Sequence, residues 1–168
     1  QSDSSTSPAP WLSFLQSSIG KKITTGITGL GLVTFIVIHL LGNLALFVSA
    51  EAYNRYAYKL EQLAPLVWTV EALLVIGVLL HAVIGIQIYL NKRQARTVNY
   101  DAYQSAGKPS HQTSSSRTMI WTGGLLALFI VWHLITFKFG PHYAIGNAEG
   151  IGPNRDLARL VVEAFQQP

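Results

Sequence analysis

The sequence has 168 residues, of which 49% are hydrophobic and only 12% are charged, whereas soluble domains carry roughly a quarter charged residues. It contains no cysteine, which excludes disulfides, thiolate metal sites and cysteine-held iron–sulfur clusters from this chain. The formal net charge of +4 is explained by the orientation of a membrane protein, so nucleic-acid binding is not expected.

The N-terminal segment, residues 1–22, is polar at first and then turns apolar. Residues 1–10 predict a disordered tail, and Trp11, Leu12, Phe14 and Leu15 form a short apolar patch suited to a membrane surface. The apolar run that follows is too long for the core of a signal peptide.

Three long apolar segments come next, at residues 23–50, 63–90 and 118–139. Residues 23–50 and 118–137 contain no charged side chain apart from histidine, and residues 63–90 contain only Glu71. Each segment reaches the roughly 20 residues that a helix needs to cross a bilayer. The sequence therefore predicts an all-α integral membrane protein, with residues 1–168 forming a single membrane domain.

The distribution of lysine and arginine predicts the orientation of these spans. Basic residues concentrate before the first span and between the second and third, at Lys21, Lys22, Lys92, Arg93, Arg96, Lys108 and Arg117. The positive-inside rule then places the N-terminus and the second loop in the cytoplasm. The first loop and the tail after Phe139 are expected to face outward.

The connecting segments predict additional, interfacial helices. In residues 51–63, Tyr53, Tyr56, Leu60 and Leu63 follow a helical spacing. Residues 91–117 are long and polar, and are expected to be partly ordered by a partner. Residues 140–168 predict an outer loop and then an amphipathic helix from Arg155 to Gln166, with Asn154 as its cap.

Each predicted span contains one histidine, and an ionisable side chain within a span suggests a function. From a rise of about 1.5 Å per residue, His39 and His133 lie about 5 and 7 Å to the outer side of their span centres. His81 lies about 5 Å to the inner side. His39 and His133 thus fit the two axial ligands of one b-type haem. His81 fits a second, inner haem whose other ligand is absent from this sequence.

Other interpretations of these residues stay open at this point. The histidines also fit interhelical hydrogen bonds or a proton relay, and Gly77 and Gly85, which clear room beside His81, also fit simple helix packing. Glu71 lies about one turn inside the outer surface, where burial would suit it to accept a proton. Alternatively its carboxylate reaches interfacial water or pairs with a neighbour. His111 and His142 are expected to be solvated loop residues.

Several short motifs resemble those of one family of respiratory proteins. They are SSIGKK before the first span, HLLGN from His39 to Asn43, Glu71 with His81 and Gly85, SRTM from Ser116 to Met119, and His133 followed by TFKFG. From about Trp11 to its end, the chain resembles the cytochrome b membrane subunit of succinate:quinone oxidoreductases, the succinate dehydrogenase and fumarate reductase family. The likeness is to the single-polypeptide, two-haem type that usually works with menaquinone.

The resemblance implies a bundle of five spanning helices around two haems b. Carried over to this sequence, His39 and His133 would hold the iron of the outer haem. His81 would be one ligand of the inner haem, whose second ligand is expected on a fourth helix after Pro168. Residues 140–168 would lead to the two missing helices.

The resemblance also implies partners and a location. These are a flavoprotein with FAD and the dicarboxylate site, and an iron–sulfur subunit on the cytoplasmic face of a bacterial inner membrane. Near that face Lys21, Lys22, Arg93 and Arg117 would contact the iron–sulfur subunit or the haem propionates. Quinone would react near the outer haem, with its proton chemistry assigned to Glu71, Glu61 or His142.

The sequence thus predicts an electron-carrying membrane anchor of respiratory complex II, which links the tricarboxylic acid cycle to quinone. A higher oligomer of the complex is compatible with this interpretation. One alternative is a haem-free, proton-coupled transporter or channel subunit that uses the histidines and Glu71 as a relay. Another is a purely structural anchor for a peripheral enzyme.

Overall fold

The computed structural model describes residues 9–94, 114–145 and 155–166. Its elements are, in chain order, α1 (Pro10–Gln16), α2 (Ser18–Asn43), the 3-10 turn η1 (Leu44–Phe47), α3 (Ala50–Gln62), α4 (Ala64–Gln94), α5 (Ser114–His133), the π-helical turn η2 (Leu134–Lys138) and α6 (Leu157–Gln166). Within these ranges the one extended pairing is an isolated bridge between Ala144 and Arg155. The predicted all-α architecture is confirmed for this part of the chain.

Three helical segments are long and apolar enough to cross a membrane, at Ser18–Phe47, Ala64–Gln94 and Arg117–Lys138. They confirm the three predicted spans, with shifted ends. Helix α2, which forms the first span, begins at Ser18, five residues before its apolar run, because the Ser17 side chain accepts a hydrogen bond from the Gly20 amide and caps the helix. Lys21 and Lys22 consequently belong to the first turns of α2.

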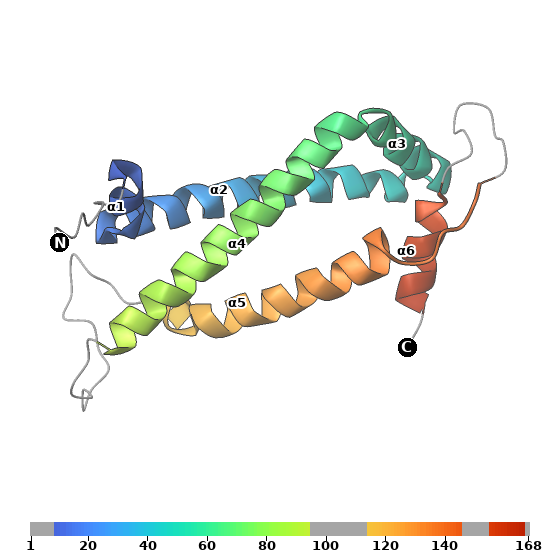
Figure 1. Cartoon of the computed structure of the whole chain (residues 1–168). Helices are drawn as coiled ribbons and strands as arrows, with labels where there is room; N and C mark the ends of the chain where they lie inside the picture. Colours follow the sequence, from blue (N-terminus) through green and yellow to red (C-terminus); the bar gives the residue numbers. More distant parts are fainter. Residues whose placement is uncertain (1–8, 95–113, 146–154, 167–168) are drawn as a thin grey trace, which may run out of the picture.

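The spans lie in alternating directions (Figure 1). Helices α2 and α5 run the same way, and α4 runs against them and crosses α2 diagonally. The α2–α4 pair is the closest packed pair of long helices. Helix α1 lies at one end of the molecule, and α3 and α6 lie together at the other, which we call the α3–α6 end.

All three spans leave large apolar side chains exposed. Leu30 on α2, Leu73 on α4 and Trp121 on α5 are 69%, 63% and 78% exposed. Lone apolar residues on a surface are ordinary, but continuous apolar faces along three helices are stable only beside lipid or other apolar helices. The fold therefore agrees with a membrane-spanning protein.

The predicted helix in the first loop is confirmed as α3, which packs on α6 instead of lying alone at the surface. Asn54 is 7% exposed in this contact, and Ala158 and Leu160 on α6 are 1% and 3% exposed. The Asn54 amide donates to Asp156 Oδ1 at 2.8 Å, and its oxygen accepts from the Ala158 amide at 3.0 Å. One buried amide group thus joins the two short helices.

The predicted amphipathic tail helix is also present, but it begins at Leu157 instead of Arg155. Asp156 caps it, because Asp156 Oδ1 accepts a hydrogen bond from the Arg159 amide at 3.0 Å. Arg155 stays outside the helix because its guanidinium donates to three carbonyls at the end of the third span, those of Lys138, Gly140 and Pro141. The arginine thereby satisfies acceptors that a helix terminus leaves free.

Some predictions concern residues outside the described ranges. They are most of the N-terminal tail at residues 1–8, the second loop at 95–113 with His111, the glycine-rich loop at 146–154, and the proposed cap Asn154. The apolar patch at Trp11, Phe14 and Leu15 is described and forms the exposed side of α1.

Candidate functional site

The structure brings together two of the three predicted span histidines. His39 on α2 and His133 at the end of α5 have ring centroids 5.8 Å apart, with ring planes inclined by 81°. They are 94 positions apart in the sequence, and they meet because α2 and α5 run in the same direction with each histidine beyond the middle of its span. The two rings form a pair on different helices, as the depth estimate predicts.

The spacing of this pair suits a metal ion held between two imidazole nitrogens. Two imidazoles bonded to opposite sides of one metal at about 2 Å each have centroids about 6.3 Å apart, so the observed 5.8 Å is about 0.5 Å shorter than that separation. In the described part of the chain, no three His, Cys, Asp or Glu side chains gather into a metal-binding group. A haem needs only two protein ligands, because the porphyrin supplies the other four, so this pair fits haem iron.

Phenylalanine rings line both imidazoles. Phe35 stacks on His39 with centroids 5.3 Å apart and an angle of 24°. Phe129 and Phe137 lie on either side of His133 in the chain, at 5.5 Å and 5.0 Å. All three are four positions from their histidine, the spacing at which side chains meet along a helix. Phe137 belongs to η2, the π-helical turn that begins directly after His133.

His81 lies in a separate place, between α4 and the first half of α2. Its Nδ1 is 3.2 Å from the Thr25 carbonyl oxygen and 3.2 Å from Thr28 Oγ1. The Thr28 hydroxyl already donates to the Thr24 carbonyl at 2.7 Å. Both neighbours are therefore acceptors, and Nδ1 must carry the proton.

This contact is an interhelical hydrogen bond, one of the interpretations open for the histidines, and it is also the kind of bond that a metal-binding histidine makes. In a neutral imidazole with a protonated Nδ1, the lone pair is on Nε2. Histidines that bind metals commonly donate their other ring N–H to a backbone carbonyl, which fixes the orientation of the ring. His81 thus has the hydrogen bond of a metal ligand.

Glycines shape the space around His81. A Cβ built on Gly29 would lie 3.0 Å from His81 Cε1, so a larger residue there would push the ring aside. Gly77 and Gly85, one turn before and after His81, have nothing within 4 Å of an added Cβ. The space beside the His81 imidazole is therefore open at the place where the sequence predicts the inner haem. Thr28 precedes His39 by 11 residues, so the two histidine sites are separated by about 16 Å along α2.

The glycine and asparagine of the HLLGN motif attach α3 to the end of α2. Asn43 accepts a hydrogen bond from the Tyr53 hydroxyl at 2.8 Å and donates to the His39 carbonyl at 2.7 Å. A Cβ on Gly42 would overlap the Tyr56 hydroxyl. Burial, together with the neighbouring Tyr56, raises the pKa of the Tyr53 phenol above its usual range, which keeps it a hydrogen-bond donor. The motif thus supports His39 from the α3–α6 end.

Glu71 forms an ion pair with Lys138, which joins α4 to the π-helical turn. The Lys138 and Glu71 side chains are 42% and 43% exposed, so the pair lies on the surface of the helix bundle. Of the alternatives for Glu71, the structure therefore contains the paired carboxylate. The other residues assigned to proton chemistry, Glu61 on α3 and His142 after η2, are exposed.

The predicted basic contacts lie at the opposite end, near α1. Lys21 is one turn before Thr25 and shares its helix face with Thr28, the two residues that contact His81. Arg117 is in the first turn of α5. Lys22 and Arg93 lie at the same end, in the first turns of α2 and the last turn of α4.

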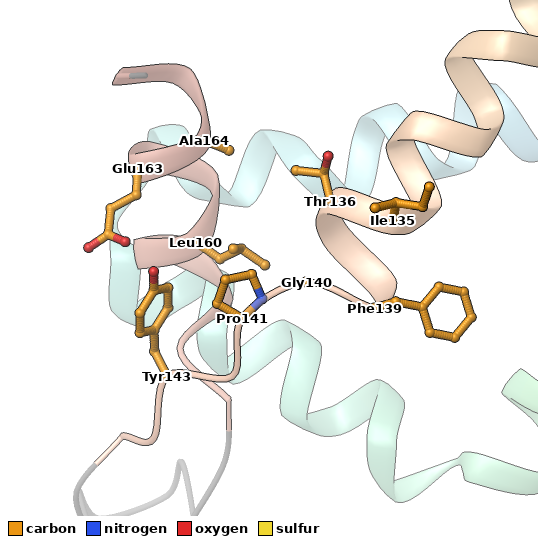
Figure 2. Close-up of a pocket in the computed structure, with 9 residues that line it drawn as sticks. All are labelled: Ile135, Thr136, Phe139, Gly140, Pro141, Tyr143, Leu160, Glu163 and Ala164. Carbon is orange, nitrogen blue, oxygen red and sulfur yellow. The ribbon is translucent and has the colours of Figure 1, made fainter. Parts of the chain in front are cut away.

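A hollow opens at the α3–α6 end, between the last turn of the third span and α6 (Figure 2). It has a volume of about 410 Å³, within the range of ligand sites. Its apolar side begins with Ile135 and Thr136, two and three residues after His133, and its other side carries Tyr143 and Glu163. Neither Glu71, Glu61 nor His142 lines it.

Tyr143, Arg159 and Glu163 form a polar cluster at this hollow that sequence reasoning missed. Arg159 donates to Glu163 Oε1 at 2.7 Å, and its guanidinium lies 4.3 Å from the centre of the Tyr143 ring. Hydrogen bonds from Tyr143 and then Arg159 hold the pKa of the Glu163 carboxyl below its ordinary value. The i,i+4 spacing of Arg159 and Glu163 is visible in the sequence, but the approach of Tyr143 depends on the fold.

The cluster of Tyr143, Arg159 and Glu163 predicts that the stability of α6 depends on pH. Because the pKa of Glu163 is lower in the folded protein than its ordinary 4.5, its ionised form supports α6 above about pH 4.5, and the support is lost as the pH falls through the folded value. Amide hydrogen exchange of α6 should therefore accelerate at acidic pH. Glu163→Gln should remove this acid-dependent step, and an equal step in that variant would contradict the assignment.

Comparison of the chain with protein-family models, with curated proteins and with solved structures finds no significant match.

Proposed function

We propose that this chain is the haem b-binding membrane subunit of a succinate:quinone oxidoreductase, carrying electrons between an iron–sulfur subunit and quinone. The observation that carries the proposal is the His39–His133 pair, two imidazoles from different spans whose ring centroids lie 5.8 Å apart, within about 0.5 Å of the separation of two imidazoles on one metal ion. The expected family, the five-helix bundle and the dicarboxylate site on another subunit are parts of the same proposal. The motifs described above support it.

In this proposal His39 and His133 would bind the outer haem, one from each face, and His81 would bind the inner haem, nearer to α1. A bound haem b supplies a centre that accepts and releases one electron at a time. The Thr25 carbonyl and the Thr28 hydroxyl accept the Nδ1 proton of His81, which leaves Nε2 as the nitrogen with the lone pair in the neutral imidazole.

The basic residues near α1 suit the proposed cytoplasmic side. Lys21 lies on the helix face of Thr25 and Thr28, where its ammonium group can neutralise a haem propionate. Arg117 serves a propionate or the iron–sulfur subunit, and that subunit in turn binds the flavoprotein that carries FAD. The positive-inside rule alone also accounts for basic residues at this end, so their distribution supports the orientation more strongly than it supports the contacts.

We place the quinone at the opposite end, in the hollow between η2 and α6. Its apolar wall begins two residues after His133, and Tyr143 and Glu163 lie at its edge. Glu163 is held by hydrogen bonds from Tyr143 and Arg159, so a part of either residue in proton chemistry requires these bonds to open. Glu71 already pairs with Lys138, so its part in proton chemistry requires that pair to open. Menaquinone is the quinone expected from the resemblance.

The test is the absorption spectrum of the complex purified from its native membrane. The proposal expects a reduced-minus-oxidised spectrum of low-spin haem b, with two haems for each copy of this chain, and oxidation of the reduced haems by added menaquinone analogue. A proton-coupled transporter subunit would show no haem absorption. A structural anchor would tolerate substitution of the histidines without loss of electron transfer.

A further inference from the structure

Three phenylalanines contact the paired histidines, each from four positions away in the sequence. Of the five rings, His39 and His133 lie at the centre, Phe35 stacks on the first, and Phe129 and Phe137 contact the second. All four centroid separations between 5.0 and 5.8 Å fall in the range of aromatic pairs. The rings therefore form one connected cluster between α2 and α5.

The contacts restrict how each imidazole can turn. A histidine ring rotates about a broad, roughly two-fold side-chain torsion, so a backbone alone does not fix its plane. Phe35 lies nearly parallel to His39, at 24°, and so limits that rotation. Phe129 and Phe137, at 32° and 51° to His133, limit it from the preceding and the following turn.

From this geometry we infer that Phe35, Phe129 and Phe137 are positioning residues, which hold the two ligand imidazoles with their planes nearly perpendicular. The inference rests on the proposed function, because it concerns the same haem. The observed angle between the imidazole planes is 81°. Each imidazole interacts with an iron d orbital of π symmetry. When the two imidazole planes are perpendicular, the two such orbitals have nearly equal energies, whereas parallel planes make their energies differ.

The angle between the ligand planes has a spectroscopic signature that does not depend on activity. A ferric haem with nearly perpendicular imidazoles gives a highly anisotropic low-spin signal in electron paramagnetic resonance, and parallel imidazoles give an ordinary rhombic signal. The outer haem of the intact complex is therefore expected to give the highly anisotropic signal. Phe35 limits the rotation of the His39 ring, and Phe129 and Phe137 limit the rotation of the His133 ring, so all three contribute to the angle between the two imidazole planes.

The experiment measures this signal and the haem content in the intact complex with Phe35→Leu, Phe129→Leu or Phe137→Leu. Each variant should retain the outer haem and shift its signal toward the rhombic form. Trp132→Leu is the matched control, since this aromatic residue adjoins His133 in sequence but is 73% exposed; its signal should stay unchanged. Full haem content with an unchanged signal in all three phenylalanine variants would overturn the inference.

If a leucine variant loses haem, two further variants at the same position distinguish the loss of the aromatic ring from the loss of side-chain volume. In that case Phe→Tyr at the same position should restore both the haem and the anisotropic signal, and Phe→Met, which fills the space without a ring, should not restore that signal. Equal restoration by methionine would overturn the inference. Failure of the proposed function looks different, since the unsubstituted complex would then contain no haem bound by His39 and His133.

Discussion

His39→Ala and His133→Ala are each expected to remove the same haem b from the intact complex, lowering its content from two haems per chain to one. The two imidazoles lie 5.8 Å apart on different spans, so removal of either leaves the other as half of a site. His81→Ala should remove the other haem, because His81 contacts Thr25 and Thr28 in a separate place. Haem content and the midpoint potential of the remaining haem provide the measurement.

His142→Ala is the control for this series, since the exposed His142 side chain lies beyond the end of the third span. It should keep both haems. The pairing would be contradicted if His39→Ala and His133→Ala removed different haems, recognised by different remaining potentials, or if neither changed the haem content.

Asn54→Leu is expected to separate α6 from α3, with a loss of about 3 kcal/mol in the stability of that contact. Leucine has the same branched arrangement of side-chain heavy atoms as asparagine, but it cannot accept the hydrogen bond that the Ala158 amide donates at 3.0 Å. It also removes the bond to Asp156 Oδ1 at 2.8 Å, which then keeps only its hydrogen bond from the Arg159 amide. Ala158 is 1% exposed, so water cannot replace the lost hydrogen bond without opening the contact. Leaving a buried polar group unpaired costs about 1–3 kcal/mol for each group.

Hydrogen exchange of the peptide that contains α6 measures this loss. A loss of about 3 kcal/mol corresponds to exchange roughly a hundredfold faster. Arg55→Ala, which breaks an exposed pair with Glu51 on the same helix, should change exchange little, because surface ion pairs contribute about 0–1 kcal/mol. Equal exchange rates in Asn54→Leu and the unsubstituted protein would show that Asn54 does not hold α6.

The spans and the depths of their histidines can be predicted from the sequence because both depend on the geometry of a single helix. A long apolar run predicts a span, and a fixed rise per residue converts position into depth. This is sufficient to place His39 and His133 at one level and His81 at another. The start of α2 was predicted five residues late because the apolar run was used as the boundary, although the Ser17 cap is visible in the sequence.

The polar contacts at the α3–α6 end depend on how short elements dock, and the sequence alone does not predict them. Asn54 and Asp156 are 102 positions apart, and Glu71 and Lys138 are 67 apart. The first pair depends on how α3 lies against the start of α6, and the second on how α4 lies against η2. For the same reason the sequence does not predict the approach of Tyr143 to Glu163, or the ion pair with Lys138 that makes a part of Glu71 in proton chemistry less direct.

An experimental density map of the intact complex tests the central claim most directly. The proposal predicts a haem between His39 and His133, with iron bonded to one nitrogen of each imidazole. It also predicts a second haem bonded to His81 Nε2, in the open space beside Gly77 and Gly85. Density showing His39 and His133 in direct contact, with lipid or side chains filling the space and no haem at either place, would contradict it.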